Sequence, residues 1–299
     1  MAYHVPVLLA ESIEGLNIKP NGTYVDLTFG GGGHSRLIME KLNRQGRLFA
    51  FDQDEDALAN AIDDKRFMLI RSNFKYFRNF LRYHGVSKVD GILADLGVSS
   101  FHLDSPERGF SFRFEGPLDM RMNRRASLSA KTVVNNYEAE DLMKIFRLYG
   151  ELNEAKRFAN AICRERSNKQ IETVEDLAEL LKPMIPQKIQ NKTLAQVFQA
   201  IRIEVNHELD VLKSMILNAE KCLTTDGRLV IISYHSLEDR LVKNYFRNGN
   251  FEGDDNPDFM GNRTVPFEQI NRKVIIPTDE ELERNSRARS AKLRIGCKL

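Results

Sequence analysis

A run of four glycines, Gly30–Gly33, follows an apolar segment at 23–29 and precedes a segment with helical spacing. In a strand–glycine–helix unit, bare backbone and the positive end of the helix can approach a ligand closely. A second apolar run, 48–51, ends in the acid Asp52. Nucleotide-binding α/β folds place there the carboxylate that binds a ribose diol. Together the two features predict a site for a nucleotide-like ligand.

The glycine spacing bears on which ligand this is. The dinucleotide fingerprint G-x-G-x-x-G would need a third glycine where Ser35 stands. Asp26, in the apolar segment before the glycines, suits S-adenosylmethionine better, because that ligand carries a sulfonium and an amino group and no pyrophosphate. A nicotinamide-dependent oxidoreductase stays an alternative. It is disfavoured by the absent glycine and by the lack of a recognisable hydride-transfer site.

Composition describes an ordinary soluble globular protein of 299 residues, 42% hydrophobic and 29% charged. The 44 basic residues nearly balance the 42 acidic ones, so net charge alone does not indicate a nucleic-acid partner. We find no signal peptide and no apolar run near the roughly 20 residues of a membrane span. Three widely spaced cysteines fit neither a disulfide framework nor a zinc site. We therefore expect a cytoplasmic protein that contacts no membrane and holds no metal.

Strands and helices alternate through the first hundred residues. Apolar runs predict a third strand at 66–70 and a fourth at 89–94, with helical spacing at 75–84 between them. This alternation predicts an α/β fold with a doubly wound parallel sheet. The next strand pattern, 228–233, comes so late in the chain that the gap must hold a structure of its own.

That gap has helical periodicity. Helices are predicted at 139–147, 153–166 and 173–181, with one or two more over 193–223. We predict an inserted all-helical domain at 104–210, within a discontinuous domain formed by 1–103 and 211–299. After the insertion, we expect a helix at 236–247 that begins with a capping box at Ser236, and strands at 273–276 and 291–295.

Functional residues of such sheets lie where the strands end. The fourth strand leads into Asp95-Leu-Gly-Val-Ser-Ser100 and then Arg108-Gly-Phe-Ser-Phe112, and the fifth into Ser233-Tyr-His-Ser-Leu-Glu-Asp-Arg240. These motifs, with those at 4–8, 28–35, 198–203 and 287–290, resemble the bacterial 16S rRNA cytosine-N4 methyltransferases of the RsmH or MraW family. The resemblance covers nearly the whole chain.

The resemblance implies a Rossmann-like class I methyltransferase sheet whose helical insertion recognises the substrate. Its cofactor would be S-adenosylmethionine. Its substrate would be the exocyclic N4 of a decoding-region cytidine of 16S rRNA in the small ribosomal subunit. The residues expected near the cofactor are Gly32, Gly33, His34, Asp52, Phe74, Asp95 and His102. A homodimer stays open, and a catalytically silent RNA-binding assembly factor with the same fold is a second alternative.

Two segments have the composition of RNA contacts. Phe110, Phe112 and Phe114 stand at alternate positions and are interleaved with Arg108 and Arg113, which is typical of loops that stack bases and hold phosphates. A hairpin that buries one aromatic face explains the pattern equally well. Near the carboxyl terminus, 284–298 holds six basic residues, Arg287 and Arg289 among them, and no acid, which predicts a phosphate-contacting patch.

The implied reaction limits the catalytic candidates. A cytosine amine is a poor nucleophile because its lone pair is delocalised into the ring, so the site must align it with the methyl group and accept its hydrogen bonds. Asp95 stands where related amino-methyltransferases begin an Asp/Asn-Pro-Pro-aromatic tetrad, but here Leu-Gly-Val follows. We predict that Asp95 positions the target amine. Tyr234 and His235 are expected to face the site in unassigned roles, and Phe110, Phe112 and Tyr234 are the candidates for base stacking.

Overall fold

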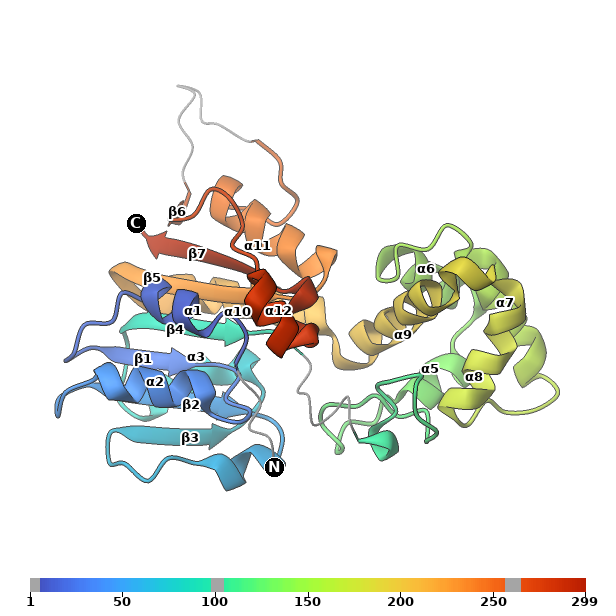
Figure 1. The fold of residues 1–299 in the computed structure, drawn as a ribbon, viewed down its shortest axis with the longest axis horizontal. Helices are drawn as coiled ribbons and strands as arrows, with labels where there is room; N and C mark the ends of the chain where they lie inside the picture. Colours follow the sequence, from blue (N-terminus) through green and yellow to red (C-terminus); the bar gives the residue numbers. More distant parts are fainter. Residues whose placement is uncertain (1–5, 98–104, 256–264) are drawn as a thin grey trace. The chain divides into compact units, whose positions relative to one another are not determined.

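A computed structural model describes residues 6–97, 105–255 and 265–299 (Figure 1). The chain divides into two compact units. We call Met1–Gly97 together with Leu209–Leu299 the sheet unit, and Val98–Glu208 the helical unit. The structural bounds of the insertion thus lie a few residues before the predicted ones.

In its described residues, the sheet unit contains seven strands in the order β3-β2-β1-β4-β5-β7-β6. Their bounds are β1 Thr23–Asp26, β2 Arg47–Asp52, β3 Phe67–Arg71, β4 Val89–Asp95, β5 Leu223–Ser233, β6 Phe267–Gln269 and β7 Lys292–Lys298. The strands from β1 to β5 pair in parallel, whereas β7 is antiparallel to both β5 and β6. The predicted α/β class is confirmed.

Helices cover both faces of this sheet. Since successive strand residues point to opposite faces, neighbouring residues of one strand contact different helices. On β4, Leu93 packs with α1 (Leu9–Gly15) and α2 (Gly33–Lys41). Its neighbour Ile92 packs on the other face, with helices α3 (Phe77–Tyr83), α10 (Glu208–Cys222) and α11 (Ser236–Asn248). Because both faces of the sheet are covered by apolar side chains, the central strands are continuous hydrophobic runs. Such runs could be recognised as strands in the sequence.

The strand predicted at 273–276 is wrong. In the described part of the chain, this segment makes only an isolated bridge between Ile275 and Leu293. Pro277 follows directly and has no N–H to donate to a ladder, and Ile276 is exposed. The edge position belongs instead to β6, which sequence analysis did not predict. The short helix α12 (Asp279–Arg284) was not predicted either.

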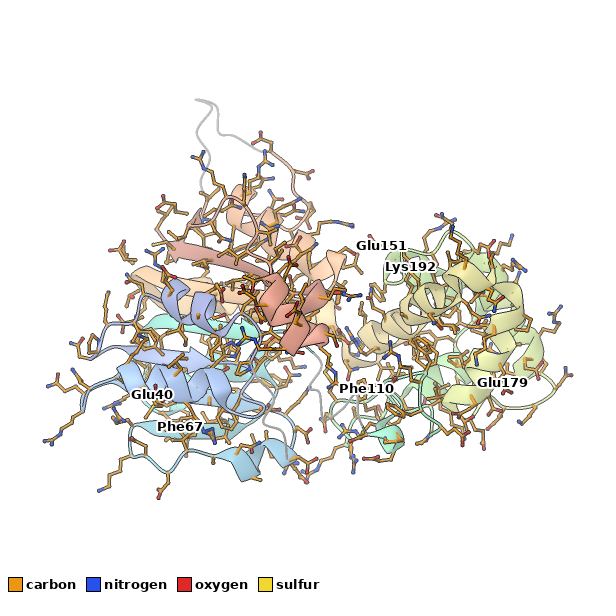
Figure 2. The ribbon with its side chains drawn as sticks, in the orientation of Figure 1. Glu40, Phe67, Phe110, Glu151, Glu179 and Lys192 are labelled. Atoms are coloured by element: carbon orange, nitrogen blue, oxygen red, sulfur yellow. The ribbon has the colours of Figure 1, made fainter. Side chains whose placement is uncertain are left out.

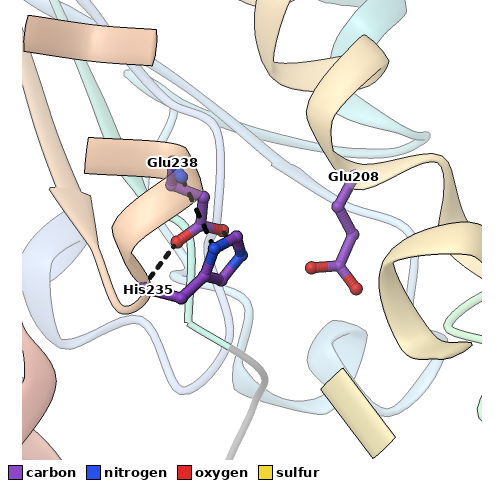
Figure 3. Close-up of side chains that lie close together, drawn as sticks. All are labelled: Glu208, His235 and Glu238. Carbon is purple, nitrogen blue, oxygen red and sulfur yellow. Dashed lines mark hydrogen bonds and ion pairs between the residues drawn. The ribbon is translucent and has the colours of Figure 1, made fainter. Parts of the chain in front are cut away.

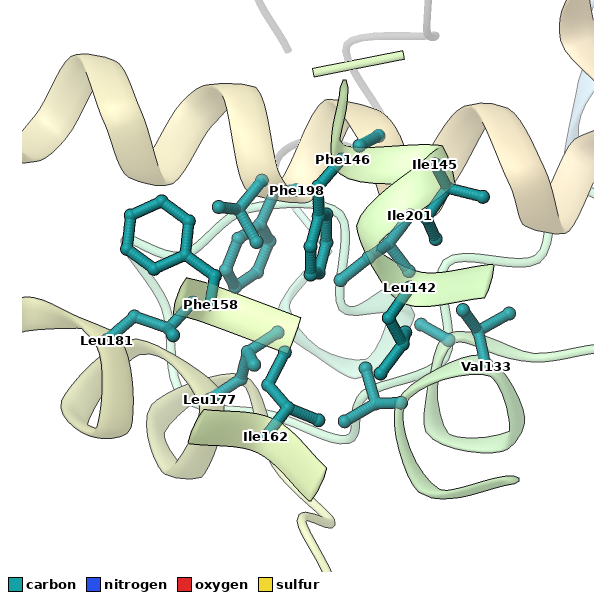
Figure 4. Close-up of a cluster of buried hydrophobic side chains, with 14 of the residues drawn as sticks. Val133, Leu142, Ile145, Phe146, Phe158, Ile162, Leu177, Leu181, Phe198 and Ile201 are labelled. Atoms are coloured by element: carbon teal, nitrogen blue, oxygen red, sulfur yellow. The ribbon is translucent and has the colours of Figure 1, made fainter. Parts of the chain in front are cut away.

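The helical unit packs its helices around one apolar core (Figure 4). Their bounds are α5 Ala130–Asn136, α6 Ala139–Leu148, α7 Ala155–Arg166, α8 Val174–Leu181 and α9 Gln190–Asn206. Phe146, Phe158 and Phe198 are among the buried side chains of this core. The segment predicted as one or two helices over 193–223 forms two, because His207 ends α9 in a left-handed conformation, φ 51°. Across the described ranges, no helix has the length and apolarity needed to cross a membrane.

Candidate functional site

The carboxyl ends of the parallel strands in the sheet unit carry a group of polar side chains. Asp26 ends β1, Asp52 ends β2 and Asp95 ends β4, while Tyr234 follows β5 directly. Because these strands pair in parallel, their ends meet at one edge of the sheet, where α/β folds place ligands.

The glycine turn after β1 has one open side. Gly30 and Gly32 adopt positive φ angles of 52° and 76°, which side chains other than hydrogen rarely tolerate. Among the described residues, a methyl group at Gly30 or Gly31 would meet nothing within 4 Å. At Gly32 it would lie 2.8 Å from the Phe29 ring, and at Gly33 it would overlap Pro6. Packing therefore requires the second pair of glycines, and the first pair leaves space for a ligand.

Asp52 ties the end of β2 to this turn. Its Oδ2 accepts the Gly30 N–H at 2.8 Å and its Oδ1 accepts the Asp54 N–H at 2.9 Å. Burial raises the pKa of this carboxyl despite these hydrogen bonds. Each carboxylate oxygen can accept a further hydrogen bond. The carboxylate can therefore hold the turn and still receive the hydroxyls of a ribose.

Asp26 is a buried residue with a structural role in the sheet unit. It is 1% exposed, and its oxygens accept the Thr28 N–H at 3.1 Å and the Ser35 hydroxyl at 2.7 Å. Burial raises the pKa of Asp26. The serine that breaks the dinucleotide fingerprint thus anchors the buried acid. We assign Asp26 to holding the glycine turn against α2.

His34 holds the amino-terminal segment over the turn. Its imidazole is buried, and Nε2 lies 3.2 Å from the carbonyl oxygen of Val7. The next residue, Leu8, donates its N–H to Glu281 Oε1 of α12 at 2.8 Å. The His34 side chain thus has an anchoring role, and the place of this residue beside the cofactor stays a prediction. The other predicted histidine contact, His102, lies outside the described residues.

The loop after β3 adds polar groups that sequence analysis overlooked. Asn73 Nδ2 donates to Gln53 Oε1 at 3.1 Å. Gln53 directly follows Asp52, the last residue of β2. Asn73 also caps the short helix Phe74–Tyr76 by accepting the Lys75 N–H. This capping position was the one available sequence signal. Phe74, predicted near the adenine, is half-buried and packs against the apolar core to which α10 and α11 contribute.

Asp95 and Tyr234 come together at the ends of β4 and β5. The backbone N–H of Asp95 donates to Thr28 Oγ1 at 2.7 Å, and its Oδ1 lies 3.4 Å from the Gly97 nitrogen. The Tyr234 phenol lies near the Asp95 carboxylate, close enough for the acid to act on its pKa. Burial raises the pKa of Tyr234 far above its ordinary value, and the nearby acid raises it further. The phenol is therefore a neutral hydrogen-bond donor.

His235 caps a helix, which corrects the prediction that Ser236 begins the capping box. Its Nδ1 accepts the Glu238 N–H at 3.4 Å, and Glu238 Oε2 accepts the His235 N–H at 3.4 Å (Figure 3). The same Oε2 accepts the Tyr234 N–H at 2.9 Å. The predicted box was one residue late, because an imidazole can cap a helix as a hydroxyl does. Both His235 and Glu238 are buried, so we assign His235 a structural role in place of a catalytic one.

The predicted RNA-contacting residues divide into buried and exposed ones. Arg108 is buried, and its guanidinium donates to the carbonyls of Arg121 and Met122. Phe110, labelled in Figure 2, is buried in the helical core. Phe112 packs edge-on against Phe198, 5.5 Å between ring centroids. We therefore do not retain Arg108 and Phe110 as RNA contacts, since burial leaves neither side chain a surface to offer; Arg113 is exposed.

The basic carboxyl-terminal run divides in the same way. Arg287 and Arg289 are exposed on the short helix Ser286–Ser290. Arg294 is buried and donates to Asp239 Oδ1 at 2.6 Å, and Lys292 lies 3.5 Å from Oδ2 of the same acid. These two cations therefore join β7 to α11, whereas Arg287 and Arg289, like Arg284, are presented at the surface.

The whole chain is similar in sequence to one group of known proteins. The sequence profile described as the MraW methylase family matches residues 1–299. The ribosomal RNA small subunit methyltransferase H of Bacteroides thetaiotaomicron is 56% identical over 298 residues, covering 100% of this chain and 98% of its own. That of Parabacteroides distasonis is 57% identical, covering 99% and 98%. A solved putative rRNA methylase from Clostridium thermocellum aligns over 99% of this chain and 100% of its own, at 12% identity and a TM-score of 0.46, too weak a likeness to add to the argument.

Proposed function

The chain belongs to the MraW methylase family, as its motifs predicted, and from that premise we propose that it methylates 16S rRNA in the small ribosomal subunit, at the exocyclic N4 of a decoding-region cytidine. The methyl donor is S-adenosylmethionine. Full-length similarity to small-subunit rRNA methyltransferases supports the substrate class. Membership of a methylase family argues against the oxidoreductase alternative. A cytoplasmic location belongs to the same proposal.

The residues at the strand ends fit this cofactor. The observation that carries the proposal is the open side of the turn at Gly30 and Gly31, beside a carboxylate with acceptor capacity left. We propose that Asp52 receives the ribose hydroxyls, and that the turn at Gly30–Gly33 and Phe74 line the cofactor. No pyrophosphate has to be neutralised, which agrees with acids at the ends of β1, β2 and β4.

The residues of this chain would act by orientation. Bound S-adenosylmethionine supplies an already activated methyl group, so the protein needs no covalent nucleophile. We propose that Asp95 accepts a hydrogen bond from the cytosine amine, which holds the nitrogen in line and favours the geometry it adopts as it reacts. The target base must be unpaired or flipped out, since a paired amine cannot enter such a site.

We propose that the helical unit recognises the RNA. It has its own apolar core, and its loop 105–129 presents Arg113, Arg124 and Arg125 at the surface. Replacing Val98–Glu208 with a short linker should preserve cofactor binding by the sheet unit and abolish rRNA methylation. Normal methylation by the shortened protein would remove the recognition role from this unit.

Transfer of a labelled methyl group from S-adenosylmethionine to purified small subunits tests the function, with nucleoside analysis of the product. We expect label in N4-methylcytidine. Label in another nucleoside would keep the enzyme class and overturn the position. Cofactor binding without any transfer would favour the catalytically silent assembly factor.

A further inference from the structure

The outer side of α3, together with the short helix Phe74–Tyr76 before it, carries cations and tyrosines. We propose that this side binds ribosomal RNA, with the cations on phosphates and a tyrosine stacked on an unpaired base. The inference rests on the proposed function and deepens it, because it gives the sheet unit an RNA-binding surface apart from the basic run at 284–298. The residues of this surface, which we call the α3 face, are Lys75, Tyr76, Arg78, Asn79, Arg82 and Tyr83.

The segment around α3 is strongly basic. Residues 65–89 hold seven cations and no acid: Lys65, Arg66, Arg71, Lys75, Arg78, Arg82 and Lys88. Some of these cations are used within the unit, since Arg66 pairs with Asp64 and Arg71 with Glu55. Lys88 donates to two backbone carbonyls at the end of α10. Within the described ranges, the three cations of the α3 face form no ion pair, so they are available to an anionic partner.

Helical spacing sorts the α3 face into two neighbouring rows. Phe77 and Leu81 are buried in the apolar core, so they set which side of the helix is turned inward. On the outer side, the cations at 75, 78 and 82 recur at intervals of three and four residues. The residues at 76, 79 and 83 form a second row with the same spacing. A row of cations therefore lies beside a row with a tyrosine at each end, the two tyrosines being about 10 Å apart along the helix axis.

Both tyrosines of the α3 face are accessible to a partner. Tyr83 is 85% exposed and Tyr76 is 48% exposed. Lys75 Nζ lies 4.7 Å from the centroid of the Tyr76 ring, and Tyr83 meets His84 edge-on, with 5.2 Å between ring centroids. A single exposed ring is ordinary, but aromatic rings interleaved with cations are typical of surfaces that bind single-stranded RNA.

Charge decides which kind of partner fits the α3 face. RNA carries a negative charge on every phosphate, and binding to a surface with cations and no acid releases the counterions of those phosphates. A tyrosine ring can stack on any base, because every base has a π-face. The α3 face therefore holds the rRNA without reading its sequence, and recognition of the sequence is left to the helical unit.

Tyr83→Ser and Tyr83→Phe form the first test, because only the second variant keeps a ring for stacking. The affinity for small subunits and for protein-free 16S rRNA should fall about fivefold or more in Tyr83→Ser and stay within about twofold in Tyr83→Phe. The KM for small subunits should rise by the same factor at unchanged kcat, because this contact is made before and during the reaction alike. Cofactor affinity should not change, since Tyr83 is at the opposite end of α3 from Phe74.

The second test removes the cations. Arg78→Ala with Arg82→Ala should lower the slope of log affinity against log salt by between about one and two, for both RNA probes. Lys41→Ala is the matched control, because this exposed cation lies on α2, whose core packing is on the other face of the sheet. It should leave the slope unchanged.

Affinity and slope that stay at wild-type values in the Tyr83→Ser and arginine variants would overturn the inference. A loss of affinity for small subunits but not for protein-free 16S rRNA would also overturn it, and would assign the α3 face to a ribosomal protein. If the wild type bound RNA through this face but methylated nothing, the proposed function would fail and the RNA-binding surface would stand.

Discussion

The two units bury different kinds of side chain. Ten polar or charged residues are buried in the described part of the chain, and only Arg108 and Thr193 belong to the helical unit. Six of the other eight lie at or just after the ends of β1 and β5: Asp26, His34, Ser35, Ser233, His235 and Glu238. The core of the helical unit is a cluster of aliphatic and aromatic side chains.

This difference has an energetic meaning. Burying a polar group costs free energy unless it is hydrogen-bonded, so an apolar core is the simpler way to hold a fold. The sheet unit buries polar side chains where its strands end. There the buried acids hold the glycine turn and the cap of α11 in place. The helical unit uses burial for packing and keeps charges such as Glu179 and Lys192 on its outside (Figure 2). We therefore expect the cofactor at the strand ends and expect the helical unit to act through its surface.

The largest expected effect separates the two units. Phe146→Ala should destabilise the helical unit by about 3–5 kcal/mol, because it opens a cavity in a closed apolar core. Cofactor affinity, measured by calorimetry below the unfolding temperature, should not change, since the strand ends are in the other unit. Leu148→Ala on the same helix is the control, because Leu148 is half exposed. A parallel loss of cofactor binding in Phe146→Ala would break the comparison.

Asp95→Ala should affect chemistry rather than stability. We expect the methylation rate at saturating cofactor to fall by about 10²–10³, the scale of one preorganised polar contact. Cofactor affinity should change little, and Asp95→Asn should fall between wild type and alanine because the amide keeps one acceptor. The opposite result, weaker cofactor binding with turnover restored at saturation, would make Asp95 a cofactor ligand only.

Asp52→Ala should act on cofactor binding. The expected loss is about 1–3 kcal/mol in calorimetry, because the hydroxyls of a bound ribose would lose their acceptor and the Gly30 N–H its partner. Asp56→Ala is the control, since Asp56 is exposed on the next turn of the chain. Equal losses in both variants would point to long-range charge instead of a ribose contact.

What sequence patterns could predict follows the same division. The central strands were predictable because both of their faces are apolar, and the glycine turn because the positive φ angles at Gly30 and Gly32 favour glycine. The helices of the insertion were predictable from amphipathic spacing. The edge strand β6 was not, since three residues carry too little pattern and its place depends on β7.

The site was less predictable than the fold. Strand ends located Asp52, Asp95 and Tyr234, but a pattern cannot show where a side chain points. The imidazole of His34 turns inward to Val7, and that of His235 caps α11. The contact between Asp95 and Tyr234 joins residues more than 130 positions apart, and only the pairing of β4 with β5 creates it.

Acid should weaken the join between β7 and α11. Burial opposes ionisation of Asp239, but its ion pair with Arg294 outweighs this and lowers the pKa below the ordinary 3.8. A lowered folded pKa means that the pair stabilises the protein above pH 3.8 and loses its contribution as pH falls through the folded value. Asp239→Asn should therefore cost about 1 kcal/mol at pH 7, allowing for solvent screening, and progressively less below pH 4 in urea unfolding. A difference that is constant down to pH 2 would exclude the ion pair as its cause.

The smallest effect asks which unit holds the RNA backbone. Arg287 and Arg289 are exposed cations of the carboxyl-terminal run, and Arg124 and Arg125 are exposed on the helical unit. Removing one cation that binds a phosphate should reduce the slope of log affinity against log salt by about one, with only a few-fold loss of affinity at moderate salt. If the helical unit alone recognises RNA, Arg124→Ala with Arg125→Ala should lower the slope by about two, and Arg287→Ala with Arg289→Ala should leave it unchanged. Equal reductions of the slope in the two double variants would show that the sheet unit also binds the RNA phosphates. Lys292→Ala is the control within the run, because that cation lies beside Asp239 and should not move the slope.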